Sequence, residues 1–174
     1  MTNIKLFTEE NIFNFDEIEI TEKEKTCIEY IKSLTESIQH SNTTFFKHLY
    51  NTFRILKNLN QNEDVCLAGL YHSVYDTEFF KSNLSVTDED IINKIGEYSN
   101  FLVRVFCSEN RGDCIYQNTL SVPTSVNKDL LYILYANEVE QSAKIGRPLN
   151  FYSKIASKII LLETYCEIGK TDVR

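Results

Sequence analysis

The chain has 174 residues, of which 43% are hydrophobic and 25% are charged, a composition typical of one globular domain. It carries 25 acidic and 18 basic side chains, and the resulting formal net charge of −7 argues against a nucleic-acid-binding surface, which needs clustered positive charge. No apolar run approaches the roughly 18 residues of a membrane span, and the first residues lack a signal-peptide pattern. We therefore expect a cytoplasmic protein that binds neither nucleic acid nor membrane.

Cysteine, glycine and proline usage indicates the fold class. The five cysteines are scattered without a C-x-x-C pair, which argues against a zinc ribbon or redox motif and favours reduced thiols packed in the core. Five glycines and two prolines are few for a turn-rich β fold. The composition therefore predicts an all-α fold, a single-domain helical bundle.

The first half of the chain contains three predicted helices. Residues 1–20 show no periodic pattern and are expected to form an N-terminal arm, so that the helical domain spans residues 21–174. Thr21 and Glu24 have capping-box spacing and open a helix predicted to end near His40. Apolar residues at helical spacing predict a second helix from about Thr44 to Leu59. An almost wholly apolar segment predicts a third, central helix from about Glu63 to Tyr75.

Four further helices are predicted in the second half. A second capping pair opens a helix from Thr87 to Gly96, and another helix follows from Glu97 to Cys107. The segment from Ser108 to Ser125 has no pattern and is predicted to be a loop. The last two helices are predicted over Asn127–Ala143 and Asn150–Cys166.

The three histidines differ in their predicted surroundings. His40 lies at the end of the first predicted helix, where a positive charge suits the helix dipole. His48 and His72 lie on or beside apolar helix faces. Taken singly, each is a hydrogen-bonded core histidine, whereas as a pair they are candidate metal ligands or catalytic acid and base residues.

A family resemblance supports the paired interpretation. The segments Phe46-Lys47-His48-Leu49-Tyr50, Leu70-Tyr71-His72-Ser73-Val74-Tyr75-Asp76-Thr77 and Leu134-Tyr135-Ala136-Asn137-Glu138 resemble the HD domain. In that superfamily of all-α metal-dependent phosphohydrolases, one helix supplies a His, the next ends in His-Asp and a later helix supplies an Asp. Residues 44 to about 145 are similar to the hydrolase domain of the stringent-response enzymes that cleave guanosine tetraphosphate. They are also similar to an HD-like group with a His-Ser-x-Tyr-Gly-Thr motif, in which this chain has Asp76 at the glycine position.

The resemblance implies ligand positions at His48, His72, Ser73 and Asn137. Ser73 and Asn137 stand where the family has carboxylates, so two negative charges are missing and a magnesium or manganese centre is not expected. Two imidazoles suit zinc, copper, iron or nickel. We expect a divalent transition metal on His48 and His72 to be weakly bound, or no metal to bind at all.

Further site residues follow from their spacing. Asp76 lies four residues after His72, so it would share a helix face with His72 if the helix continues. The resemblance implies that Asp76 orients the attacking water, and the alternative is a turn residue at the end of the helix. Burying the Asn137 amide without partners would cost about 1–3 kcal/mol, so it is expected to meet the histidines or a ligand. The residues expected to bind substrate are Asn137, Ser73, Tyr75 and Glu140; for Glu140 the alternative is a solvated helix face.

Two functions from different classes stay open at this point. The resemblance implies a divergent HD-type hydrolase with an altered metal site, acting through His48, His72 and Asp76 on a small phosphorylated or nucleotide-like molecule. The loss of both carboxylates supports an alternative, a non-catalytic HD-like module that binds a ligand or regulates a partner. A purely structural helical protein would explain the helices but not two inward-facing histidines.

Overall fold

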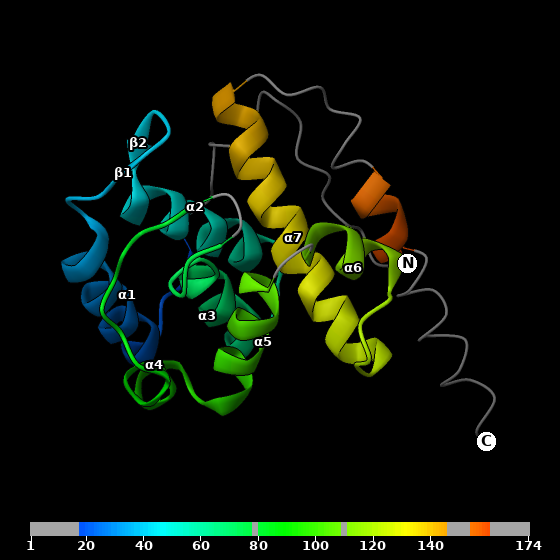
Figure 1. The fold of residues 1–174 in the computed structure, drawn as a ribbon, viewed down its shortest axis with the longest axis horizontal. Coiled ribbons are helices and arrows are strands. Elements are labelled where there is room, and N and C mark those ends of the chain that lie inside the picture. Colours follow the sequence, from blue (N-terminus) through cyan, green and yellow to red (C-terminus); the bar gives the residue numbers. More distant parts are fainter. Residues whose placement is uncertain (1–17, 78–79, 109–110, 146–153, 161–174) are drawn as a thin grey trace.

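Two consecutive helices, α2 (Phe45–Asn58) and α3 (Glu63–Tyr71), form the centre of the fold in the computed structural model of the chain (Figure 1). The structure describes residues 18–77, 80–108, 111–145 and 154–160. All residues from Val65 to Tyr71 are buried, because α3 is apolar on every side and is surrounded by other helices. It contacts α2, α1 (Glu22–Thr35), α4 (Asp88–Ile95), α5 (Glu97–Cys107) and α7 (Thr124–Ile145).

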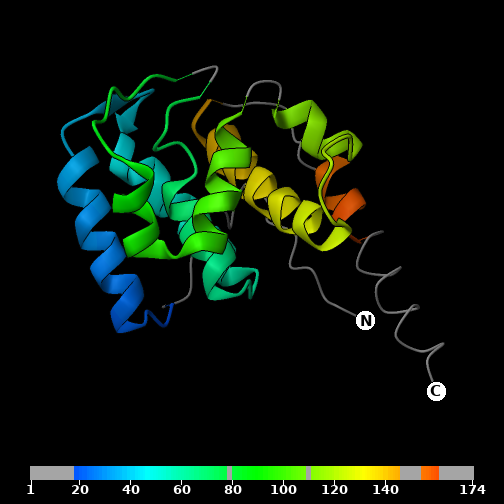
Figure 2. The same ribbon diagram turned by 60° about the horizontal axis from the view of Figure 1, so that its bottom comes forward.

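The remaining elements cover this centre. Helix α1 lies at one edge of the molecule, and the long helix α7 crosses the other side of α2 and α3 (Figures 1 and 2). Residues 154–160 are helical and lie beside α6 (Arg111–Gln117), where Lys158 Nζ is 4.8 Å from the centroid of the Tyr116 ring. The predicted all-α single domain is confirmed. Among the described helices, none has the length and apolarity that a membrane crossing requires.

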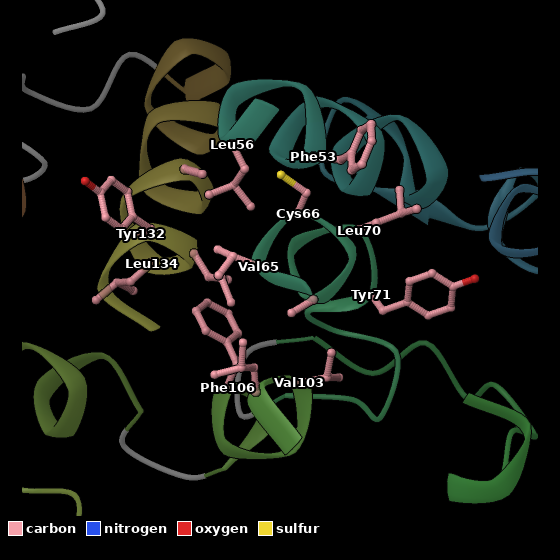
Figure 3. Close-up of a cluster of buried hydrophobic side chains, with 14 of the residues drawn as sticks. Phe53, Leu56, Val65, Cys66, Leu70, Tyr71, Val103, Phe106, Tyr132 and Leu134 are labelled. Carbon is pink, nitrogen blue, oxygen red and sulfur yellow. The ribbon is translucent and has the colours of Figure 1, made fainter. Parts of the chain in front are cut away.

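Side chains from four helices fill the core around α3 (Figure 3). Val65 and Cys66 of α3 face Leu56 of α2, and Phe106 of α5 lies on the opposite side of Val65. On α7, Tyr132 and Leu134 belong to the same hydrophobic cluster. Tyr71 points the other way, toward α1, where its hydroxyl donates to the Cys27 carbonyl at 2.9 Å. The core therefore extends continuously from α1 to α7 through α3.

The helix starts predicted from capping patterns are confirmed. Thr21 and Glu24 form a complete capping box at the start of α1, and Thr87 and Asp90 form another at the start of α4. The Glu24 carboxylate is fully buried and also accepts from Lys57 Nζ at 2.8 Å, which joins α1 to α2. These two boxes depend only on residues three positions apart, which is why the sequence pattern was sufficient to find them.

The first helix is shorter than predicted. It ends at Thr35 rather than near His40, and residues Gln39–His40 (β1) instead pair antiparallel with Thr43–Thr44 (β2). Ser41 adopts a positive φ of 51° in the turn between these strands. The predicted role of His40 as a charge at a helix C-terminus is therefore wrong, because no helix ends there.

Three other parts of the chain differ from the prediction. Helix α3 ends at Tyr71 instead of Tyr75, and the chain turns where the Val74 amide donates to the Tyr71 carbonyl at 2.9 Å. Helix α6 lies inside the segment predicted to be a loop, and α7 begins at Thr124 rather than Asn127. Of the predicted helix Asn150–Cys166, residues 154–160 are helical; residues 150–153 and 161–166, like most of the predicted N-terminal arm, lie outside the described residues.

Gly69 allows α2 and α3 to approach each other closely. A Cβ atom on Gly69 would lie 2.1 Å from Leu56 Cδ1 and 3.7 Å from Thr52 Cγ2, both on α2. A carbon–carbon separation of 2.1 Å is far inside van der Waals contact, so only glycine fits at this position without a shift of Leu56. The two helices that carry His48 and His72 therefore pack at a distance that depends on the absence of this side chain.

We expect Gly69→Ala to lower the free energy of unfolding by up to about 2 kcal/mol. Overpacking against Leu56 costs about 1–3 kcal/mol, and replacing a helical glycine with alanine offsets about 1 kcal/mol of this. Chemical denaturation measures the difference. Gly112→Ala in α6 is the matched control, since nothing lies within 4 Å of its Cβ position, and this variant should be as stable as the wild type or slightly more stable. Equal stabilities for the two variants would contradict the close approach.

Candidate functional site

Three polar side chains from separate helices meet inside the bundle. His48 lies on α2, His72 caps the C-terminus of α3, and Asn137 lies on α7. The Nε2 atoms of His48 and His72 are 3.0 Å apart, and Asn137 Oδ1 is 3.1 Å from His72 Nε2. Their exposed fractions are 1%, 0% and 7%. The structure thus brings together both histidines and the asparagine that the sequence singled out.

The opposite ring nitrogen of each histidine faces a hydrogen-bond acceptor. His48 Nδ1 is 2.6 Å from Glu140 Oε2, and His72 Nδ1 is 2.7 Å from the Gly69 carbonyl oxygen. A carboxylate and a carbonyl can only accept, so in both rings Nδ1 carries the hydrogen and donates it. In the neutral form of each ring, Nε2 therefore presents a lone pair to the centre of the site.

Asn137 adds a third lone pair to the same point. Its Nδ2 donates to Glu138 Oε1 at 3.2 Å, which turns Oδ1 toward His72. Three acceptor atoms, namely two imidazole nitrogens and one amide oxygen, therefore face one another. Acceptors at about 3 Å repel unless a hydrogen or a cation lies between them, so the arrangement is suited to hold either one additional proton or a metal ion.

Glu140 stands behind His48 rather than at the centre of the site. Its side chain is fully buried, and its second oxygen, Oε1, accepts from Asn51 Nδ2 at 3.3 Å. Asn51 follows His48 by three residues on α2, and Glu140 follows Asn137 by three residues on α7, so one helical turn separates each pair. The alternative of a solvated helix face is wrong for Glu140, and its contacts are with His48 and Asn51.

The structure adds His40 to the cluster, which the sequence prediction missed. The His40 ring stacks on the His48 ring with centroids 4.3 Å apart and an interplanar angle of 16°, and Phe80 packs edge-on against His40. His40 is buried, with an 8% exposed fraction, and reaches this place because β1 turns back over α2. The local sequence carries no signal for this contact, since it depends on a two-residue strand pair.

Three of the predicted site residues, Asp76, Tyr75 and Ser73, make no side-chain hydrogen bond to the histidines or to Asn137 among the described residues. Asp76 has a positive φ of 64°, and its Oδ1 accepts from Ser82 N, Ser82 Oγ and Asn83 N at 2.7, 2.8 and 3.3 Å. The Tyr75 hydroxyl donates to Asn100 Oδ1 at 2.6 Å. Ser73 is buried, and within the described residues its hydroxyl makes no hydrogen bond. The helix does not continue past Tyr71, which is why Asp76 does not share a helix face with His72.

The Asp76 carboxylate stabilises the loop that follows it. Burial disfavours its ionised form, but the hydrogen bonds from Ser82 and Asn83 outweigh this effect and lower the pKa of Asp76. Asp and Asn tolerate a positive φ better than most residues because their short side chains bond locally. The geometry therefore favours the turn role for Asp76 over an orienting role for water.

The donor atoms of the cluster suit some metal ions and not others. In the described ranges, no three His, Cys, Asp or Glu side chains are grouped as metal ligands. The third donor near the two imidazoles is the amide oxygen of Asn137, a neutral group. Magnesium and manganese need anionic oxygen ligands and do not fit this set, whereas zinc, iron, nickel and copper accept imidazole nitrogens.

We expect Asp76→Asn to stay close to the wild type in stability and Asp76→Ala to lose about 1–2 kcal/mol of the free energy of unfolding at pH 7. The asparagine keeps an acceptor and tolerates the positive φ, whereas alanine does neither. Because the folded-state pKa is lowered, the carboxylate contributes stability above its usual value of 3.8, and this contribution is lost as the pH falls through the folded-state pKa. Denaturation at several pH values measures both effects. Normal stability of Asp76→Asn together with a 100-fold loss of turnover would instead support the catalytic role predicted from the sequence.

Comparison with protein-family models matches part of the chain to a family. A family model described as a domain of unknown function, DUF6817, matches residues 31–111. The matched segment includes His40, His48, His72 and Asp76 and ends before Asn137 and Glu140. No curated protein and no solved structure matches the chain.

Proposed function

We propose that the chain is a divergent HD-type enzyme that hydrolyses a small phosphorylated or nucleotide-like molecule. The resemblance of residues 44 to about 145 to HD phosphohydrolases supports the reaction class. The observation that carries the proposal is that two lone-pair atoms, His48 Nε2 and Asn137 Oδ1, lie 3.0 and 3.1 Å from a third, His72 Nε2. This is the arrangement that a bound cation would organise.

His48 and His72 would hold a divalent transition metal, with Asn137 as a third, weaker ligand. A zinc-type ion bound there supplies Lewis-acid polarisation of a phosphoryl group. The chain's own contribution is orientation, because the hydrogen bonds from Nδ1 to Glu140 and Gly69 keep both imidazoles in one tautomer and one direction.

The surroundings of the histidines favour chemistry away from bulk water. Phe106 packs edge-on against His72 with centroids 5.3 Å apart, and His40 covers one face of His48. In such a place, electrostatic interactions with a charged phosphate ester are stronger than they are in water. His40 and Asn137, each with a small exposed fraction, are the parts of the cluster nearest to solvent, so we infer that the substrate approaches from their side.

We expect the purified protein to bind about one zinc, iron or nickel ion per chain. His72→Ala should lose this ion, since one of the two imidazole ligands is gone, and His40→Ala should retain it because His40 stacks on His48 from outside the group of three acceptors. Elemental analysis after metal exchange and desalting measures the stoichiometry. Absence of bound metal in the wild type after incubation with each of these ions would contradict the metal-dependent enzyme.

Metal-loaded protein is expected to hydrolyse at least one member of a panel of phosphate monoesters, diesters and nucleotides. His48→Ala should lower kcat/KM by 100-fold or more, and treatment with a chelator should abolish turnover. Phosphate release measures monoester hydrolysis, chromatographic separation of substrate from product measures the hydrolysis of diesters and nucleotides, and Gly112→Ala serves as a control variant outside the site. Failure of the loaded wild type on the whole panel would overturn the phosphohydrolase.

A second candidate function is a non-catalytic ligand-binding or regulatory module built on the same scaffold. The neutral groups at Ser73 and Asn137 favour it, because they stand where HD enzymes have carboxylates. Thermal denaturation with the same panel separates the two candidates. A ligand that raises the midpoint by several degrees without being hydrolysed, in protein that takes up no metal, would favour the module over the enzyme.

A further inference from the structure

We propose that Glu140 is a positioning residue that supplies, from behind His48, part of the negative charge that Ser73 and Asn137 do not provide to a bound cation. This inference rests on the proposed function and concerns how the site compensates a divalent transition metal.

The geometry around His48 supports this role. Glu140 Oε2 lies 2.6 Å from His48 Nδ1, a distance typical of a charge-assisted hydrogen bond, and His48 Nε2 faces the centre of the site. A carboxylate bonded to the far nitrogen of an imidazole makes the near nitrogen a stronger donor to a metal. Glu140 therefore acts on the site through the imidazole and does not need to touch the ion.

Glu140 is held in place by the helix that carries His48. Its other oxygen, Oε1, accepts from Asn51 Nδ2 at 3.3 Å, so α2 binds both oxygens of a side chain that comes from α7. His72 differs, because its Nδ1 donates to the neutral carbonyl of Gly69. In the hydrogen bonds described above, the negatively charged partner is therefore bonded to His48, and His72 has a neutral partner.

Charge balance is the physical reason for such a residue. A divalent ion bound only by neutral groups in a buried site would leave its charge uncompensated, which is costly. Glu140 is itself fully buried and separated from the centre by the width of one imidazole ring. At this distance, in a medium of low dielectric constant, its attraction for a cation is much larger than it would be in water.

The inference is tested by moving the charge back to the ligand position. Apo-protein is prepared with a chelator, and zinc alone is titrated in competition with an indicator dye. The variants are Glu140→Gln, Asn137→Asp and the double variant. Glu24→Gln is the matched control, since Glu24 is also a fully buried glutamate with hydrogen bonds, but to Lys57 and Thr21. Chemical denaturation of each apo-variant separates loss of stability from loss of affinity.

We expect Glu140→Gln to weaken zinc binding by 10- to 100-fold, the range observed when outer partners of ligating histidines are removed. The double variant should bind zinc at least tenfold more tightly than Glu140→Gln alone, because the carboxylate that Asn137→Asp introduces then contacts the ion directly. Glu24→Gln should lose stability but keep the zinc affinity of the wild type. If Glu140→Gln does not fold, Glu140→Asp, which retracts the carboxylate from His48, should weaken binding in the same direction.

Three results would overturn the inference, each in a different way. If the wild type binds zinc and the Glu140 variants bind it with the same affinity, the role of Glu140 is overturned and the proposed function still stands. A loss in Glu140→Gln that Asn137→Asp does not rescue would also overturn it, since the effect would then not be one of charge. A wild-type chain that takes up no zinc would overturn the proposed function and this inference together.

Discussion

Three buried acceptor atoms that face one another impose the main physical constraint on this structure. Lone pairs at about 3 Å are unfavourable by themselves, so positive charge between them, as a proton or a metal ion, is needed for the arrangement to be stable. The constraint extends outward from the centre. Each imidazole can present Nε2 inward only because Nδ1 has an acceptor on its other side, Glu140 in one case and Gly69 in the other. The hydrogen bonds to the two Nδ1 atoms therefore determine that each Nε2 faces the inside of the cluster.

The helical scaffold explains how residues so far apart in the chain reach that point. Helix α3 is apolar on all sides and lies at the centre, so the residue that caps its C-terminus, His72, is buried. Helices α2 and α7 both pack against α3 and against each other, and each contributes two polar residues one turn apart, His48 with Asn51 and Asn137 with Glu140. The apolar core thus determines the positions of the polar groups, and the polar groups determine which ring nitrogen faces inward.

Features that depend on nearby residues were predictable from the sequence, and features that depend on tertiary contacts were not. The capping boxes at Thr21 and Thr87 and the central position of α3 follow from local patterns and from apolarity. The meeting of His48, His72 and Asn137 was anticipated through a family resemblance, since spacing alone does not bring together residues 24 and 65 positions apart. The ends of α1 and α3 were predicted too late, near His40 and Tyr75, because the helices end at Thr35 and Tyr71 and the chain then turns at residues of positive φ, Ser41 and Asp76. Glu140 was expected to bind substrate or to face solvent, because a charged residue on a helix gives no sign of a partner 92 positions away.

The hydrogen-bond acceptors of the two histidines differ in how easily a substitution can remove them. The acceptor for His72 is a backbone oxygen, which every amino acid at position 69 would retain, so no single substitution deletes it. The acceptor for His48 is a side chain, and one altered codon at position 140 removes it. Divergence among related sequences should therefore erode the α7 side of the cluster first and leave the histidine at the end of α3 oriented as it is here.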